Sequence, residues 1–418
     1  MVVPRKLHIE LHQFQNMLGC PNRDDTNQVK TAMLGNSIRG RWASQSIKYA
    51  MNHFLVTESL LSEDEMGERT RVISIPVCRS LINKGESQND AANIADAICR
   101  LAISSKNSES GYLLYTAHMG IDKLMTVGLR YKKDLLELCN DYAKVQPLDE
   151  GQSRQEWSAK LKDGEKNKVG RIVEKFQKTS TGKNILKEVL DPLNGLFAMG
   201  NAISIAAGGR MVSDRPEFSI IGAMGASHAI TTNKIRRDTD FLTAMDTIAK
   251  QAAMLEHQSF SSGCYYKYHV WDVQTMINNL HGQWELALYG IKAYIEAAIK
   301  ALPVAKLNSF GNYNLPDFVM LTIRNKGCNQ SFLNAFVKPV TGEDLLIESV
   351  LRLAKYYNNA CRCYPDDGAT NYYFCTQDKV LAEHKWNQDS EAWIDVRSIR
   401  DIVSQAGKSI TEYVLQKG

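Results

Sequence analysis

The sequence predicts an α+β protein with a ferredoxin-like core. Six elements carry this prediction, because they follow one another as strand, helix, strand, strand, helix, strand. This βαββαβ order is typical of the ferredoxin-like fold. Two insertions interrupt it: a long, mostly helical segment follows the first helix, and a polar arm with an apolar tip separates the two middle strands.

The first strand is predicted over residues 7–14, where apolar and polar residues alternate. Alternation with a period of two indicates a strand with one face in a core. His8 and His12 have the i, i+4 spacing of a helical zinc site, but along a strand this spacing keeps their side chains well apart. We therefore expect no metal at this strand.

Residues 22–51 concentrate groups that bind anions. The first half reads as a loop of turn-forming residues, in which Gly35 and Gly40 let a backbone approach a ligand closely. The helix that follows is predicted to have Ser44 as its N-cap, and its free N–H groups and positive dipole end attract anions. The cations of this stretch are Arg23, Lys30, Arg39, Arg41 and Lys48. Without a Walker-type loop, the predicted ligand is a polyanionic backbone rather than a single nucleotide.

The first insertion, residues 61–208, reads as mostly helical. Apolar residues recur at helical spacing over residues 91–103, 120–142 and 185–205. Within the insertion, residues 146–187 are polar and rich in lysine. A charge run of this kind is usually a solvated face, and the alternative is a second nucleic-acid surface. The sequence leaves both interpretations open.

The remaining core elements follow the first insertion. Residues 218–232 read as extended chain, residues 264–273 as an aromatic-rich strand and residues 318–323 as a further strand. Between the last two strands, residues 284–302 have the apolar spacing of an amphipathic helix, which Pro303 closes.

The second insertion, residues 233–262, is the polar arm. Its cations are followed by Phe241, Leu242 and Met245, and then by a short helix-like piece around residues 248–255. His228 precedes the arm and has no recognisable nucleophile or acid partner. We therefore expect a hydrogen-bonded structural histidine at position 228 rather than a catalytic one.

Composition is that of an ordinary globular protein of two or three domains. A net charge of +4 over 418 residues is too small to indicate nucleic-acid binding by itself. We expect a cytoplasmic protein, because no apolar run is long enough for a membrane span and the N-terminus lacks a signal-peptide layout. The nine cysteines contain no CxxC motif, which favours reduced thiols, and Cys361, Cys363 and Cys375 lack a fourth metal ligand. No cofactor is expected.

Five motifs together resemble those of one family, the crRNA-binding backbone subunit of the CRISPR Cascade complex of type I-E (the CasC-like family). Each motif alone is unspecific, but their shared order along the core is highly specific. They are NRDD…K…RxRxxSQSxK at residues 22–48, GRM at 209–211, SHAITT…DFLTAMD at 227–246, FSSGxYYxY at 260–268 and NAFxK at 334–338. The helical insertion and the C-terminal tail match only loosely.

The resemblance implies a hand-shaped protein with an RRM-like palm, a helical fingers domain and a β-hairpin thumb. The implied palm comprises residues 1–60, 209–232 and 263–345, the fingers residues 61–208, the thumb residues 233–262, and a helical or mixed extension residues 346–418. In the family, several copies polymerise along the spacer of the guide RNA (crRNA) without acting as enzymes. The implied partners are crRNA, target DNA, neighbouring copies and other Cascade subunits, in antiviral defence in a prokaryotic cytoplasm.

The resemblance also implies roles for single residues. The expected RNA contacts are Arg23, Lys30, Gln45, Ser46 and Lys48 from family positions, joined by Arg39, Arg41 and Ser44 from the anion-binding stretch. Met211 and Leu242 fall where the family places apolar wedges that fold one guide nucleotide out of the stack. An aromatic residue is expected at the thumb wedge, where this chain has Leu242. Near the family positions that touch target DNA lie Lys178, Lys183 and Lys187.

Two further functions are alternatives. Related backbone subunits of other CRISPR types cut target RNA with a loop aspartate, and the paired carboxylates of Asp24 and Asp25 could bind Mg²⁺. Adjacent acids beside cations are more simply explained as anchors of the loop. The other alternative is a generic single-strand binder whose bases stack on Tyr265, Tyr266, Tyr268 and Trp271.

Overall fold

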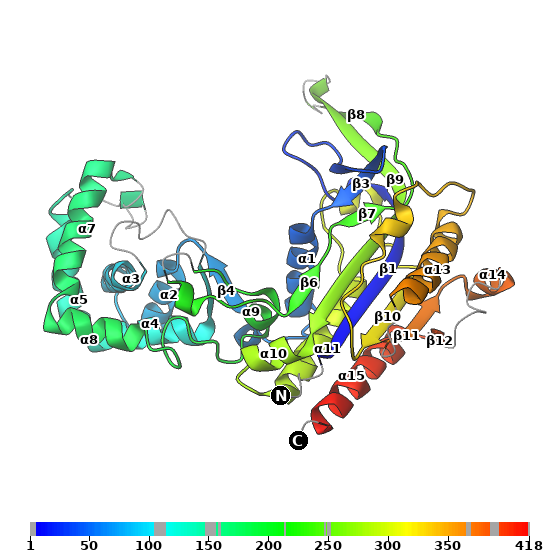
Figure 1. The fold of residues 1–418 in the computed structure, drawn as a ribbon. Coiled ribbons are helices and arrows are strands. Elements are labelled where there is room, and N and C mark those ends of the chain that lie inside the picture. Colours follow the sequence, from blue (N-terminus) through cyan, green and yellow to red (C-terminus); the bar gives the residue numbers. More distant parts are fainter. Residues whose placement is uncertain are drawn as a thin grey trace. The chain divides into compact units, whose positions relative to one another are not determined.

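The computed structural model describes residues 6–103, 114–146, 156–157, 160–212, 215–245, 248, 252–364, 369–384 and 393–416. The chain divides into two compact units, which Figure 1 traces. The palm unit comprises Met1–Leu61, Ala223–Asn278 and Gly282–Gly418. The fingers unit comprises Ser62–Gly222 and Asn279–His281.

The palm unit contains the predicted ferredoxin-like core. Its central strands are β1 (His8–Gly19), β7 (Ala229–Thr231), β9 (Ala252–Asp272) and β10 (Phe318–Arg324). They pair in the order β10, β1, β9, β7, and all neighbours are antiparallel. In sequence, α1 (Ser44–Thr57) follows β1, and α11 (Trp284–Lys300) lies between β9 and β10. This is the order of fourth, first, third and second strands that a βαββαβ chain produces.

The sheet extends beyond this core on both sides. A hairpin of β2 (Thr31–Leu34) and β3 (Ser37–Trp42) joins the edge at β7, and β11 (Ala369–Cys375) and β12 (Trp393–Asp395) join the edge at β10. The sequence predicted a loop before α1, whereas the structure has the β2–β3 hairpin there. Its turn places Gly35 at a φ of +56°, a left-handed conformation that glycine adopts at little cost.

Helices cover both faces of the sheet. On one face, α11 packs against α1 and against α15 (Ile399–Leu415). On the other face, α13 (Leu345–Cys363) and the 3₁₀ turn η3 (Leu333–Phe336) cover an apolar cluster. The strands contribute Phe14, Tyr266 and Phe318 to this cluster, and the helical elements contribute Phe336, Val350 and Leu353. Both faces of the central strands are therefore buried.

The predicted arm is a long β-hairpin. β8 (Asp238–Met245) pairs antiparallel with the first half of β9, whose second half is the central palm strand. One strand of 21 residues thus runs from the arm into the middle of the palm sheet, and Figure 1 shows the arm projecting beyond the other palm strands. The helix-like piece expected around residues 248–255 is strand from Ala252 onward, and residues 246–247 and 249–251 lie outside the described part.

The fingers unit is mostly helical. Its helices are α2 (Ser74–Asn83), α3 (Gln88–Ala102), α4 (His118–Arg130), α5 (Lys132–Ala143), α7 (Asp163–Gln177), α8 (Ser180–Val189) and α9 (Ile203–Gly208), and a small sheet pairs β4 (Gly67–Thr70) with β5 (Leu114–Ala117). The single helix expected over residues 185–205 is wrong. α8 ends at Val189 and α9 begins at Ile203, because Pro192 cannot continue a helix between them.

Short elements complete the chain. They are η1 (Glu63–Glu65), η2 (Pro216–Phe218), β6 (Met224–Ala226), α10 (Val273–Asn279), α12 (Leu307–Phe310) and α14 (Asp378–Glu383). β6 pairs with β9 beside β7. Every helix in the described part of the chain is too short or too polar to span a bilayer.

Candidate nucleic-acid interface

The loop before the β2–β3 hairpin is held by the side chain of Asp24. Its Oδ1 accepts hydrogen bonds from the Gln28 N–H (2.9 Å), the Thr26 N–H (3.0 Å) and the Thr26 hydroxyl (2.8 Å). These bonds, that from Gln28 foremost, lower the pKa of Asp24. Beside Asp24, the exposed Arg23 donates to Asn27 Oδ1 at 2.7 Å. Asp24 therefore shapes the loop that carries Arg23 at its surface.

Asn22 brings this loop, the hairpin and the start of α1 together. Its carbonyl accepts from the Lys30 N–H at 3.0 Å, and its side-chain Oδ1 accepts from the Ala43 N–H at 2.9 Å. The Arg41 N–H in turn donates to the Lys30 carbonyl at 2.9 Å. The sequence marks Asn22 only as a turn residue, whereas the structure gives it the central position in this region.

Helix α1 begins at Ser44, but the prediction that Ser44 is its N-cap is wrong. The N-cap is Ala43, whose side chain cannot accept a hydrogen bond. The Ser44 N–H donates instead to Nδ1 of His228 at 2.9 Å, which confirms a hydrogen-bonded structural histidine. Within the described residues, no acceptor takes the N–H groups of Gln45 and Ser46. These groups lie at the positive end of the helix dipole and are available to an anion.

The region exposes, fully or in part, a set of side chains that we name the palm grip. Its members are Arg23, Lys30, Arg41, Ser44, Gln45, Ser46 and Lys48. Cationic side chains, hydroxyls and N–H groups of this kind bind the phosphates and sugars of a nucleic-acid backbone. The palm grip therefore has the chemistry of an interface that is independent of base sequence.

Arg39 does not belong to the palm grip, contrary to the prediction. Its side chain is fully buried at 0% exposure. The guanidinium donates to four backbone carbonyls, those of Thr231 (3.0 Å), Thr232 (2.7 Å), Phe336 (2.8 Å) and Val337 (3.1 Å). Arg39 therefore ties β3 to the end of β7 and to η3, and it stabilises the hairpin that carries the interface.

The two glycines of the hairpin approach protein atoms rather than a ligand. A Cβ on Gly35 would lie 2.5 Å from the carbonyl oxygen of Val337. A Cβ on Gly40 would lie 2.5 Å from the hydroxyl of Tyr265. We expected these two glycines to let a ligand approach the backbone. Instead they let the hairpin pack closely against the rest of the palm.

Met211 lies on the fingers unit beside a buried arginine, and its own side chain is 80% exposed. The Arg210 guanidinium donates to the carbonyls of Phe197 (2.7 Å), Phe218 (3.1 Å) and Tyr115 (3.4 Å). Burial lowers the pKa of Arg210 to about 10. The fixed arginine thus holds the backbone from which a flexible apolar side chain extends, as a wedge requires.

Leu242 lies in β8, opposite Glu256 of β9, and its side chain is outside the described part of the structure. The preceding residue, Phe241, is 62% exposed, and its ring centroid lies 4.4 Å from that of His257. The thumb hairpin therefore presents an aromatic ring one position before the expected wedge. Phe241 belongs to the DFLTAMD motif but was not among the residues predicted to contact RNA, and its exposed ring makes it a candidate.

Lys178, Lys183 and Lys187 lie where α7 meets α8 in the fingers unit. Lys178 is the C-cap residue of α7, and Lys183 and Lys187 are one turn apart on α8. Lys178, Lys183 and Lys187 are all exposed. Their positive charge is accessible on one corner of this unit.

The four aromatic residues of the single-strand-binder alternative lie in the palm core. Tyr265 and Tyr266 are 1% exposed, Tyr268 is 8% exposed and Trp271 is 0% exposed. Tyr265 stacks on Trp42 with ring centroids 4.5 Å apart. Because these rings pack against protein, they cannot stack on bases, and the alternative that depends on them is wrong.

Comparison with known proteins gives matches along almost the whole chain. The sequence matches the family model described as CT1975-like protein over residues 9–403. No curated protein sequence matches it. In fold, the chain is similar to a chain of a "CRISPR RNA-guided surveillance complex, pre-nicking", with 21% identity, a TM-score of 0.72, and coverage of 96% of this chain and 100% of that one. A chain of a "CRISPR RNA-guided surveillance complex" is also similar, with 18% identity, a TM-score of 0.65, and coverage of 96% and 99%.

Proposed function

Because the chain belongs to the family of CT1975-like proteins, we propose that it is a crRNA-binding backbone subunit of a CRISPR surveillance complex, of the CasC-like type I-E kind. Two solved structures of similar fold are chains of CRISPR RNA-guided surveillance complexes, which supports this assignment. The observation that carries the proposal is the palm grip, in which cations and two N–H groups at a helix start lie together. The subunit is a scaffold rather than an enzyme.

The palm grip binds RNA through its phosphates and sugars. Lys30, Arg41 and Lys48 supply positive charge, while the N–H groups of Gln45 and Ser46 donate to phosphate oxygens. Such contacts carry no sequence information, so the subunit holds any guide. The base edges stay free to pair with target DNA, which then determines the sequence that is recognised.

Several copies lie along one guide RNA, and other subunits of the complex complete the assembly. In each copy Met211 and Leu242 are apolar wedges that fold one nucleotide out of the stack, with Phe241 beside Leu242. Insertion of apolar side chains between bases unstacks them without reading their identity. Lys178, Lys183 and Lys187 contact the target DNA through its phosphates.

Replacing Lys30 and Lys48 together by alanine is expected to weaken RNA retention by about 10- to 100-fold, because two charge-assisted contacts are lost. Each lost phosphate contact is also expected to reduce the salt slope of binding by about 0.7, the value for single strands. The measurement is co-purification with the neighbouring gene products, sequencing of the bound RNA, and a salt titration of binding.

The matched control replaces Lys355 of α13 and Lys379 of α14, two exposed lysines, by alanine, and it is expected to retain RNA normally. Short RNAs with a constant repeat-derived flank and variable spacers support the proposal. Heterogeneous cellular RNA, or equal retention by the Lys30 and Lys48 variant, contradicts it. Mg²⁺-dependent cutting of a complementary RNA by the wild type would contradict the scaffold role.

Replacing Leu242 by glycine is expected to abolish the periodic reactivity of guide nucleotides that the wedge holds out of the stack. Without the apolar side chain, each such nucleotide regains stacking on its neighbours. Chemical probing of the RNA in the assembled complex measures this. Thr243→Gly adds the same flexibility to β8 but on the opposite face of the strand, so its pattern is expected to stay periodic. A periodic pattern in L242G rules out the wedge role.

A further inference from the structure

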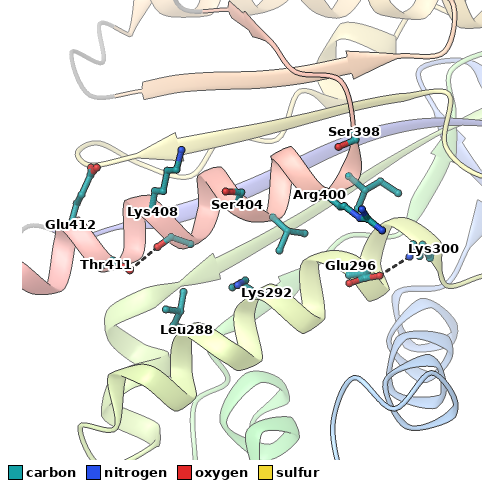
Figure 2. A pocket seen from close by; sticks show the side chains of 13 residues that line it. Leu288, Lys292, Glu296, Lys300, Ser398, Arg400, Ser404, Lys408, Thr411 and Glu412 are labelled. Carbon is teal, nitrogen blue, oxygen red and sulfur yellow. Dashed lines mark hydrogen bonds and ion pairs between the residues drawn. The ribbon is translucent and has the colours of Figure 1, made fainter.

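Helices α11 and α15 of the palm unit lie side by side and leave a groove between them, which Figure 2 shows from close by. The groove has a volume of about 1040 Å³. At one point the helices touch, because a Cβ on Gly407 would lie 3.6 Å from Cδ of Lys292. On α11 the lining runs from Leu288 to Lys300, so the groove follows the helix axes for about 18 Å.

The floor of the groove is apolar. Leu288 of α11 and Ile399 and Val403 of α15 line it, and all three side chains are only partly buried. Ile399 and Val403 are one turn apart on α15, and Leu288 adds a third apolar side chain from α11. Covering partly exposed aliphatic side chains with another apolar surface is favourable, because it removes apolar area from water.

The rim of the groove carries an excess of positive charge. Lys292, Arg400 and Lys408 line it and are exposed, and no carboxylate of the described residues lies within ion-pair distance of them. The fourth cation, Lys300, is engaged by Glu296 at 2.6 Å, as the dashed line in Figure 2 shows. Three cations of the rim are thus left for an acidic partner.

An amphipathic helix with acidic flanks fits both parts of this surface. Its apolar residues at i, i+4 and i+7 would cover Leu288, Ile399 and Val403, and its carboxylates would meet the three cations. A nucleic-acid strand fits less well, because it has no continuous apolar face that could cover the apolar floor of the groove.

We propose that the groove between α11 and α15 is a docking site for an acidic amphipathic helix of a different protein subunit in the same assembly. The acidic run Glu63–Glu65 of this chain is a single 3₁₀ turn and not a helix of this kind. The docking site shares no residue with the palm grip, so protein docking and RNA binding can be measured separately.

The test places a photoreactive p-benzoyl-phenylalanine at position 404, in the full chain assembled in cells with its neighbouring gene products. Ser404 is exposed and lines the groove between Arg400 and Lys408. The expected result is a cross-link to one protein segment that is rich in Asp and Glu and has apolar residues at helical spacing. The same probe at Lys355 of α13 is expected not to cross-link that segment.

Charge reversal then tests the electrostatic part. Lys292→Glu with Lys408→Glu is expected to lower the cross-link yield at position 404 at least 10-fold while bound RNA stays unchanged. The matched control, Lys355→Glu with Lys379→Glu, is expected to keep the full yield. Replacing the acids of the cross-linked segment by lysine is expected to restore docking on the reversed groove.

Four results overturn the docking site: a cross-link to nucleic acid, a cross-link to a second copy of this chain, a cross-link to a segment without acids, or no protein cross-link in particles that contain RNA. A cross-link to an acidic helix in particles without RNA has a different meaning. It supports the docking site and contradicts the proposed RNA-binding function.

Discussion

Replacing Arg324 by methionine is expected to lower the free energy of unfolding of the palm unit by about 3–5 kcal/mol. Nε of Arg324 on β10 lies 2.9 Å from Oε1 of Glu10 on β1, and both side chains are at most 2% exposed. The ion pair joins the two strands at one end of their ladder, where Arg324 is the last residue of β10 and lies opposite His8. Methionine fills much of the space but leaves the Glu10 carboxylate buried without the guanidinium charge. His12, whose Nε2 lies 3.6 Å from Glu10 Oε2, does not replace that charge at neutral pH, because burial lowers its pKa.

The measurement is hydrogen exchange of β1 and β10 amides, which reports the palm unit rather than the whole chain. The matched control is the double variant Glu10→Gln, Arg324→Met. It removes both charges together, so it is expected to recover more than half of the stability lost by R324M alone. Protection of β10 in R324M within about 1 kcal/mol of the wild type would contradict a stabilising ion pair.

Replacing Lys267 by methionine is expected to stabilise the palm unit, most strongly at neutral and lower pH. Lys267 on β9 pairs across the ladder with Gln13, whose amide donates to the Ala298 carbonyl of α11 at 3.2 Å. Lys267 therefore lies between the sheet and α11, where it is 2% exposed. This burial lowers the pKa of the Lys267 amine to about 7.

The sign of the pH dependence follows from proton binding. The unfolded lysine keeps its proton up to about pH 10.4, whereas the folded one loses it near pH 7, so the unfolded state binds more protons between these values. The cost of burying Lys267 is therefore complete below pH 7 and disappears as pH rises toward 10.4. At about 1.4 kcal/mol per pKa unit, the full cost is on the order of 5 kcal/mol.

Denaturant unfolding of K267M and wild type at several pH values measures this. We expect the gain in the denaturant midpoint of unfolding to shrink as pH rises above 7, and to be absent near pH 10. Lys355→Met is the control, because Lys355 is exposed and its replacement is expected to have no pH-dependent effect. An equal gain at every pH would show that K267M acts through packing and not through the buried charge.

The core of the fold was predictable because its elements have strong local periodicity. The alternation in β1 and the amphipathic spacing of α11 each indicate one structure without help from the rest of the chain. The β2–β3 hairpin lacks such a pattern. It is short and polar, and its register depends on Arg39 and on the packing of Gly35 and Gly40 against distant residues.

The same limit applies to the candidate site. The sequence identifies a cationic residue but not its exposure, so it gave no reason to separate Arg39 from Lys30. In the structure Arg39 is fully buried, whereas Lys30 is partly exposed. His228 lies far from Ser44 in sequence, and only folding brings it to the start of α1. Phe241 and Leu242 are neighbours on one strand, and which side chain the thumb exposes depends on the hairpin.

The continuous strand β9 couples the thumb hairpin mechanically to the palm. At about 3.3 Å per residue, its 21 residues extend for about 70 Å from the thumb into the palm. In the palm, β1 pairs with one edge of β9, and β7 and then β6 pair with the other. β9 has no loop between its thumb half and its palm half. This strand therefore provides no hinge residue about which the thumb can swing freely. A load applied at the tip of the thumb is therefore carried by the ladder hydrogen bonds of β9 at the centre of the palm sheet.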